Sequence, residues 1–349
     1  MTYQISEALI RLTEIIDKGR VDLYKPIQIA EVLYHSRIHG NVDFSDIKTF
    51  QNPSLRWRNS VTQRLTGKQS TSSARFQHDV WSETAMPPDM LKLLDEFNKA
   101  NDAAIEKIIY LRYAERQGTV VGIITYIKNT KSEDFSLPEL LKKFISTPGI
   151  TRSIDKAYEI ITYSIFEVLI ESLEATICIN VSEKHNDLLH EFADIAQVLL
   201  GLPPGAISYE RPARLYRVGV TNAADRGLDM WANFGPAIQV KHLTLDPGKT
   251  NLIIDQIESD SIVIVCRDVD ASTIEIITQQ IGWGKRVQGI VTESNLVDWY
   301  ERCLRGKYSE QLAEPLMELL IDGFSAEFPQ SLTLQDFMSE RGYVKPSEI

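Results

Sequence analysis

The residues best suited to chemistry lie in the second half of the chain, where Asp229, Gln239 and Lys241 occur close together. Gln239 and Lys241 are two residues apart, so on a β-strand they share one face, while Ile238 and Val240 point to the core. A carboxylate, a carboxamide and an ammonium group at one sheet edge are suited to metal-dependent phosphodiester hydrolysis. Asp229 would bind a hard divalent cation, with the Gln239 side-chain oxygen and the Val240 carbonyl as neutral ligands. Lys241 would orient or activate the attacking water and offset charge on the phosphorane.

Two short strands must pair for these residues to meet. Leu228 to Ala232 and Ala237 to Leu243 have strand-like patterns, and Asn233-Phe-Gly-Pro between them is typical of a turn. Pairing through this turn would bring Asp229 to the edge that carries Gln239. The alternative is a surface hairpin whose polar face happens to carry these residues.

The spacing of an acid or glutamine two residues before a lysine occurs in one other place, Asp46-Ile-Lys48. That segment has no aspartate about ten residues upstream and no β-type run around it. The structural context therefore favours the segment around Lys241.

A second informative segment is the window of residues 52–75, which contains five basic residues and no acidic residue. Arginines in this window could contact phosphates or read guanine O6 and N7 in the major groove, and the serines could donate to backbone phosphates. A helix N-terminus near the serines would strengthen phosphate binding. The alternative is a solvated basic helix followed by a polar loop. The candidates for DNA contact here are Arg56, Arg58, Arg64, Lys68, Ser70, Ser72, Ser73 and Arg75.

Weaker candidates for the DNA backbone are Arg211, Arg214 and Arg217, which enter the catalytic strands. Trp57, Trp231 and Trp283 are interpreted as core or packing residues rather than as platforms for base stacking.

The first 115 residues or so have a helical pattern, with a long helix expected over Met90 to Arg116. Thr119 to Ile127 is rich in β-branched residues and predicts a strand, and Leu137 to Ile145 predicts a short helix. Pro148-Gly149 then marks a domain boundary, so that residues 1–148 form a mostly helical recognition portion and residues 149–349 a second domain.

In the second domain, helical and strand patterns alternate. Helices are expected over residues 153–174, 183–200, 250–258 and 272–281 and near the C-terminus, and strands over residues 175–181, 215–221, 261–266 and 287–291. Apolar strands covered by helices on both faces make this half an α/β sandwich.

Composition restricts the class of protein. The chain has 349 residues, 43% of them hydrophobic and 24% charged, as in folded globular proteins. No apolar stretch is long enough to cross a membrane and no secretory signal is visible, so a cytoplasmic location is expected. The net charge of −11 is polarised, because the window of residues 52–75 carries +5 and the remainder −16. One anion-binding face on an otherwise acidic protein is therefore compatible with the sequence.

Several catalytic classes are absent from the sequence. The six histidines include no HExxH pair, and there is no GxSxG elbow and no GxxxxGK[ST] phosphate loop. Cys178, Cys266 and Cys303 are widely spaced and predict neither a disulfide nor a zinc site.

The spacing Asp229-x9-Gln239-x-Lys241 after an Asp225-Arg-Gly-Leu turn resembles the PD-(D/E)XK nuclease motif in its Gln variant. Together with the segments that begin at Ile154-Asp-Lys-Ala-Tyr-Glu and Asn52-Pro-Ser-Leu-Arg-Trp, it resembles the HaeII-type restriction endonucleases over most of the chain. The resemblance implies a central mixed sheet flanked by helices, with a largely helical N-terminal portion.

The resemblance also implies an activity. This is Mg²⁺-dependent cleavage of double-stranded DNA at a palindrome of the purine-GCGC-pyrimidine kind, with Mn²⁺ as a substitute and a cognate methyltransferase in the same cell. A palindromic target requires two active sites related by a two-fold axis, so a homodimer is expected. Nucleases of this kind often take a further carboxylate from the helix before the sheet, where Glu159 is the first candidate and Glu167 and Glu171 are rivals.

Two other functions remain open from the sequence. One is a structure-specific or methyl-directed nuclease with the same motif. The other is a DNA-binding protein that retains a nuclease fold without activity.

Overall fold

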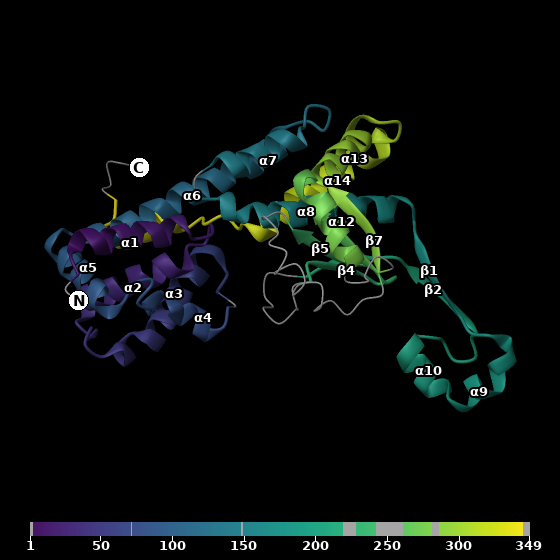
Figure 1. Ribbon diagram of the computed structural model, residues 1–349, viewed down its shortest axis with the longest axis horizontal. Helices are drawn as coiled ribbons and strands as arrows, with labels where there is room; N and C mark the ends of the chain where they lie inside the picture. Colours follow the sequence, from purple (N-terminus) through teal and green to yellow (C-terminus); the bar gives the residue numbers. More distant parts are fainter. Residues whose placement is uncertain are drawn as a thin grey trace. The chain divides into compact units, whose positions relative to one another are not determined.

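The computed structural model describes residues 3–70, 72–147, 149–218, 228–241, 261–280 and 286–344. Contacts between Cα atoms divide the chain into two compact units, both of which are drawn in Figure 1. The described part of the first unit lies within residues 3–160 and 320–344, and that of the second lies within residues 161–218 and 228–319. The units divide within the helix that follows the boundary expected after residue 148, and that boundary stays a prediction.

The first unit is helical, as its sequence predicts. Short 3-10 turns cover Ile47–Thr49, Asp79–Trp81 and Thr151–Ser153. The helices are α1 (Ile5–Asp17), α2 (Tyr24–His39), α3 (Gln51–Thr66), α4 (Ala74–His78), α5 (Pro88–Ala100), α6 (Ala104–Asn129), α7 (Leu137–Ser146), the beginning of α8 (Ile154–Ser172), the end of α14 (Ser309–Glu327) and α15 (Leu334–Glu340).

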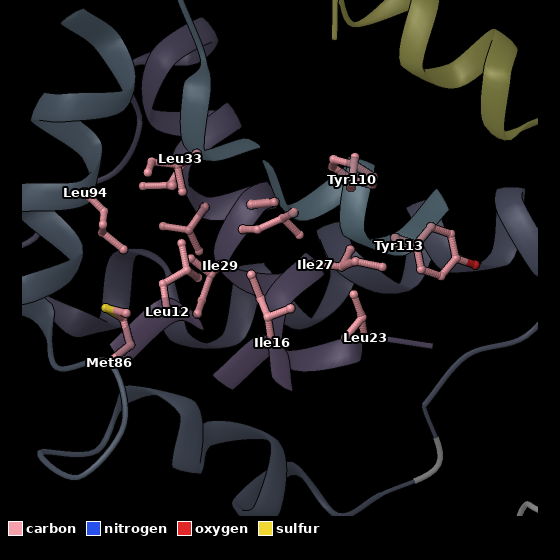
Figure 2. Close-up of a cluster of buried hydrophobic side chains, with 14 of the residues drawn as sticks. Leu12, Ile16, Leu23, Ile27, Ile29, Leu33, Met86, Leu94, Tyr110 and Tyr113 are labelled. Atoms are coloured by element: carbon pink, nitrogen blue, oxygen red, sulfur yellow. The ribbon is translucent and has the colours of Figure 1, made fainter. Parts of the chain in front are cut away.

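Burial of apolar side chains from several helices forms the core of this unit. Figure 2 shows Leu12 and Ile16 of α1 with Ile27 of α2, Leu94 of α5 and Tyr113 of α6. All five are 4% exposed or less. Because apolar burial is the main favourable term in folding, this cluster supports the helices that carry the basic window.

The strand predicted over Thr119 to Ile127 is wrong, because this segment is the last part of the 26-residue helix α6. Its buried residues Val120, Ile123, Ile124 and Ile127 recur at the spacing of one helix face. The β-branched composition suggested a strand, but burial of this face favours a helix over the weaker local propensity.

The single long helix expected over Met90 to Arg116 is interrupted between α5 and α6. Asp102 and Ala103 have positive φ angles of 48° and 57°, which no continuous helix accepts. The Asn98 side-chain oxygen accepts from the backbone N–H of Ile105 at 3.0 Å and of Glu106 at 3.3 Å, and so satisfies two donors at the start of α6.

The second unit contains a mixed five-stranded sheet in the order β3-β4-β5-β6-β7. β3 with β4 and β4 with β5 are antiparallel, whereas β5 with β6 and β6 with β7 are parallel. This sheet, together with the helical N-terminal part, confirms the expected mixed α/β class. The strands are β3 (Leu215–Arg217), β4 (Met230–Ala232), β5 (Ala237–Lys241), β6 (Ile262–Cys266) and β7 (Val287–Thr292).

Helices lie against this sheet (Figure 1). α12 (Ala271–Gln280) packs Ile274 into an apolar cluster with Ile262, Ile264 and Cys266 of β6. α13 (Glu293–Arg305) begins with a capping box at Thr292, and its Tyr300 hydroxyl donates to the Ile161 carbonyl of α8 at 2.9 Å. A 3-10 turn covers Asp268–Asp270.

A separate two-stranded antiparallel ribbon follows α8. It consists of β1 (Thr176–Asn180) and β2 (Ser208–Pro212), of which only β1 was predicted. A 3-10 turn, Glu183–His185, and the helices α9 (Asn186–Glu191) and α10 (Ala193–Leu200) connect the two strands. The helix expected over residues 183–200 is thus divided at Phe192, whose φ of −114° and ψ of 33° depart from helical geometry.

Among the described residues, no helix has the length and apolar character needed to span a membrane. Cys178 is an exposed free thiol, whereas Cys266 and Cys303 are buried free thiols. The helix expected over residues 250–258 and the last two residues of the strand expected to end at Leu243 lie outside the described residues.

Candidate active site and DNA-binding residues

The β4–β5 pair positions the candidate catalytic residues. Met230 of β4 is opposite Ile238 of β5, and the intervening turn is closed by the Ala232 N–H, which donates to the Pro236 carbonyl at 2.8 Å. Gly235 in this turn has a φ of 123°, a conformation that favours glycine. Asp229 immediately precedes β4, so the pairing expected from the sequence brings it beside Gln239.

The Asp229 carboxylate is held by two donors from β5. Its Oδ2 accepts from the Gln239 amide nitrogen at 2.5 Å and from the Val240 backbone N–H at 2.8 Å. The Asp229 carbonyl also accepts from the Val218 N–H at 2.9 Å, which continues the ladder to β3. The aspartate is thus fixed at the edge where β4 and β5 begin to separate.

The Gln239 side chain is 3% exposed, and its Oε1 has no hydrogen-bond partner among the described residues. A buried carbonyl oxygen normally has a partner, because desolvation without one is unfavourable. The N–H and C=O groups of one strand residue point to the same side, so the Val240 carbonyl faces the side of Asp229. A carboxylate with two neutral oxygens fits a hard divalent cation such as Mg²⁺.

Such a site would have a low negative charge. Within the described ranges, no group of three or more His, Cys, Asp or Glu residues is arranged to bind a metal ion. A cation beside Asp229 would therefore depend on the Gln239 and Val240 oxygens and on water for its other ligands.

Lys241 is the last residue of β5, two positions after Gln239 and opposite Cys266 of β6. Only its backbone belongs to the described part of the chain, and the position of its side chain lies outside it.

The three candidate glutamates of α8 have different surroundings. Glu159 belongs to the first unit, is 5% exposed and binds the Lys156 ammonium through both carboxylate oxygens at 2.7 and 2.6 Å. Glu167 belongs to the second unit with Asp229 and accepts from the Leu215 N–H at 3.2 Å. Burial raises the pKa of Glu167, opposed by this hydrogen bond. Glu167 is thus joined to the sheet that carries Asp229.

Basic residues lie beside this part of α8. Burial raises the pKa of Tyr163, with smaller contributions from Glu167 and Glu171. Arg214 and Arg217 oppose this rise, so both arginines are near Tyr163. Arg214 is exposed, Arg217 is opposite Met230 in the sheet, and Arg211 lies on the ribbon strand β2.

Two aromatic rings are exposed on the face of the sheet that carries Asp229 and Gln239. Trp231, two residues after Asp229, stacks on Tyr216 with a centroid separation of 4.5 Å and an interplanar angle of 22°. Trp231 is 44% exposed and Tyr216 is 40% exposed. Trp231 is therefore not a core residue, but it packs on Tyr216, and the expectation of a packing residue rather than a base-stacking platform stays a prediction. The strand alternation that places it beside Asp229 could have identified it.

Trp57 agrees with the packing interpretation, because it is half-buried and stacks on His35 at 3.8 Å. Trp283 lies outside the described residues.

The basic window falls on α3, α4 and the segment between them, and its arginines differ in exposure. Arg56 and Arg75 are exposed. Arg58 is fully buried, and its guanidinium donates to Gln28 at 3.1 Å and to Gln77 at 2.5 Å. Burial lowers the pKa of Arg58 to about 10. This position supports an internal structural role for Arg58.

Two further basic residues of the window bind the C-terminal segment of the same unit. Arg64 makes two hydrogen bonds of 2.7 Å to the Glu340 carboxylate of α15. The Lys68 ammonium donates to the carbonyls of Ala326 and Glu327 at the end of α14, at 2.6 and 3.1 Å. A cation at a helix C-terminus also interacts favourably with the helix dipole.

The serines of the window lie around the start of α4. Ser73 caps this helix, with its hydroxyl accepting from the Phe76 N–H at 3.3 Å, and the Ser72 carbonyl accepts from the Gln77 amide. Ser70 and Ser72 are half-buried and Ser73 is exposed.

Comparison with known proteins identifies the class. The sequence profile of the HaeII restriction endonuclease family matches residues 8–343. The type II restriction enzyme NgoBI of Neisseria gonorrhoeae is 43% identical over 346 residues, which cover 98% of each chain. The type II restriction enzyme HaeII of Haemophilus aegyptius is 41% identical over 340 residues, which cover 97% of each chain. No solved structure shows significant similarity.

A mixed sheet with an Asp–Gln pair on its inner strands, in a chain with these relatives, defines a type II restriction enzyme, a site-specific deoxyribonuclease. The chain belongs to the HaeII restriction endonuclease family.

Proposed function

We propose that the enzyme hydrolyses phosphodiester bonds of double-stranded DNA in the presence of Mg²⁺ at a short palindromic site. The sequence resemblance implies a site of the form purine-GCGC-pyrimidine. The metal requirement is supported by the buried Gln239 Oε1, which lies next to the Asp229 carboxylate and has no hydrogen-bond partner within the described ranges.

We further propose that Asp229, Gln239 and Lys241 form the PD-(D/E)XK motif in its Gln variant. Asp229, Gln239 and the Val240 carbonyl would hold Mg²⁺, with Mn²⁺ as a substitute. When bound, the cation lowers the pKa of a water molecule and stabilises charge on the phosphate. The Asp229 carboxylate is preorganised by the Gln239 amide and the Val240 N–H, so little rearrangement precedes binding.

Lys241 would supply a positive charge that orients the attacking water and offsets charge on the phosphorane. Glu159 remains the first candidate from the sequence for a further carboxylate. The hydrogen bond of Glu167 to the Leu215 backbone favours Glu167 as the rival, because it joins Glu167 to the sheet of Asp229.

Among the basic candidates, exposure favours Arg56 and Arg75 in the first unit and Arg214 in the second for contact with DNA phosphates. Arg64 and Lys68 would have to exchange partners in the C-terminal segment for phosphate oxygens. Ser70, Ser72 and Ser73 remain proposals for backbone contacts, as do Arg211 and Arg217.

A palindromic site presents the same sequence on both strands, so a two-fold symmetric homodimer would place one active site on each strand. A methyltransferase of the same cell would protect the host sites, and the enzyme would act in the cytoplasm, where the DNA lies.

Digestion of plasmid DNA with purified protein and Mg²⁺ tests the proposal. Discrete fragments whose ends fall within the palindrome are expected, with no cleavage in EDTA. Irregular degradation would instead indicate a structure-specific nuclease, and cleavage restricted to methylated plasmid a methyl-directed one. Full activity in EDTA would contradict the metal requirement.

A further inference from the structure

The helices α9 and α10 lie at the end of the β1–β2 ribbon (Figure 1), and they expose several large apolar side chains. Val198 and Leu199 of α10 are 89% and 77% exposed, and Ile195 on the same helix is 54% exposed. Leu188 of α9 and Phe192 between the helices are 58% and 48% exposed. We call these five residues the tip face. Residues 195, 198 and 199 lie three and four positions apart, so they form one stripe on α10.

The opposite side of these helices already has a partner in the chain. Leu189, Ala193 and Ala196 lie around Leu202 and the following Pro203, where Leu202 is 2% exposed. The tip face has no such cover from the described residues, and no residue of α9 or α10 is buried.

The ribbon that carries the tip has little support of its own. Along β1 and β2, half-buried residues alternate with exposed ones, so neither face of the ribbon is fully covered. Isolated two-stranded ribbons and helices as short as α10 are marginally stable in water. An apolar partner on the tip face would therefore stabilise this region.

The charge of the segment that carries the tip face argues against DNA as its partner and in favour of a protein. The segment of residues 182–207 contains four acidic residues and one lysine, a net charge of −3. A polyanion such as DNA would be repelled by this segment, and DNA contacts depend on basic residues. The exposed apolar side chains of the tip face instead fit a protein surface.

The area of the tip face is enough for a small self-association. Its five side chains expose roughly 500 Å², so two copies would bury roughly 1,000 Å² in total, the lower limit of a specific interface. In a two-fold dimer the same patch meets itself, so the apolar stripe of one α10 would cover that of the other.

We propose that the tip face is the contact between two copies of this chain. This inference rests on the homodimer proposed above and adds the surface that forms it. Each ribbon would then carry α9 and α10 to a two-fold axis, where Val198 and Leu199 of both copies pack together.

Sedimentation equilibrium of the purified full chain over a micromolar concentration series tests the inference. Wild type is expected at twice the mass of one chain. Val198→Glu and Leu199→Glu, each of which would bury a charge in the contact, should raise the dimer dissociation constant at least about 30-fold. Gln197→Glu adds the same charge on another side of α10 and should leave the dissociation constant within about 3-fold of wild type.

At concentrations where wild type and variants are all monomeric, the variants should have the circular dichroism and melting temperature of wild type, because the replaced side chains are exposed. If Val198→Glu and Leu199→Glu form dimers with unchanged dissociation constants, the tip face is not the dimer contact and the inference is overturned. The proposed homodimer itself would then still stand. A monomeric wild type would contradict both the tip contact and the dimer. Plasmid cleavage by wild type, measured separately, tests the nuclease proposal independently of either outcome.

Discussion

The Gln239 amide nitrogen donates to the Asp229 carboxylate at 2.5 Å, while the buried Gln239 amide oxygen finds no hydrogen-bond partner in the described part of the chain. One end of the carboxamide thus orients the aspartate, and the other presents a neutral oxygen at the same sheet edge. A glutamate at this position would supply oxygens but no donor for Asp229. The glutamine therefore keeps the pair stable before a cation binds.

Gln239→Glu tests this dual role. The variant would place two carboxylates in contact, and their repulsion should lower the melting temperature in EDTA by several degrees. Mg²⁺ should restore the melting temperature, because a cation offsets the added charge, and cleavage should require less Mg²⁺ than in wild type. Thermal scans and cleavage rates over a Mg²⁺ titration measure both effects.

Gln197→Glu, an exposed substitution of the same kind, is the control for that titration. If Gln239→Glu binds Mg²⁺ but cuts poorly, the Gln239 NH₂ group also contacts the scissile phosphate. A variant identical to wild type in melting temperature and Mg²⁺ response would remove Gln239 from the site.

Substitutions of Arg58 and Arg56 should have different effects, the first on folding stability and the second on DNA binding. Arg58→Met leaves the oxygens of Gln28 and Gln77 without a donor in the core, so the free energy of unfolding should fall by about 2–4 kcal/mol. Arg56→Met should change this free energy by less than about 0.5 kcal/mol but weaken DNA binding and lower the salt slope by about one. Urea unfolding and DNA titrations at several salt concentrations give the two quantities. An Arg58→Met protein of wild-type stability would refute the structural role.

His35 should make the first unit sensitive to acid. Burial lowers the pKa of His35 from 6.5 to about 4, helped by the charges of His39 and Arg341. The unfolded chain therefore binds the proton more tightly than the folded protein. The contribution of His35 is complete above about pH 6.5 and is lost progressively as the pH falls toward 4.

The melting temperature of His35→Gln should consequently fall less between pH 7 and pH 5 than that of wild type. This holds even if loss of the stack on Trp57 lowers the stability of the variant at both pH values. His185→Gln, at an exposed position, should show the same fall in melting temperature between these pH values as wild type. If the melting temperatures of wild type and His35→Gln fall equally, His35 is not the source of the acid sensitivity.

Trp231 and Tyr216 are expected to contact DNA next to the scissile phosphate. Trp231 is two residues from Asp229 on the same sheet face, a distance of about 7 Å along a strand. Trp231→Ala should weaken binding of a cognate duplex about 5- to 10-fold, and Trp231→Phe should retain most of the affinity. Fluorescence anisotropy with Ca²⁺ in place of Mg²⁺ would measure binding without cleavage.

The exposed Tyr308 of the same unit provides a control, since Tyr308→Ala should bind DNA as wild type does. Equal affinities of Trp231→Ala and Tyr308→Ala would show that the stacked pair makes no contact with DNA.

The part of the site formed by neighbouring segments could be predicted from the sequence. The strand patterns around Asn233-Phe-Gly-Pro were sufficient to pair β4 with β5 and to bring Asp229 beside Gln239. Local turn chemistry and two-residue alternation determine this arrangement, and both can be recognised in a single sequence.

Features that depend on distant segments could not be predicted. Arg64 and Lys68 bind residues more than 250 positions away, and no local pattern indicates such partners. The helix over Thr119 to Ile127 was missed for a different reason, because its β-branched composition was given more weight than the spacing of its buried residues. The second ribbon strand, β2, contains Pro212 and charged residues and lacks an apolar run.

The catalytic role of Asp229 is tested most directly by the single-turnover cleavage rate of Asp229→Asn at saturating Mg²⁺. Asparagine retains a side-chain oxygen to accept from the Val240 N–H but removes the carboxylate charge, so the fold should persist. We expect a melting temperature within a few degrees of wild type and a cleavage rate at least ~10²-fold lower. An Asp229→Asn enzyme that cuts the same plasmid at close to the wild-type rate would contradict the catalytic role of Asp229.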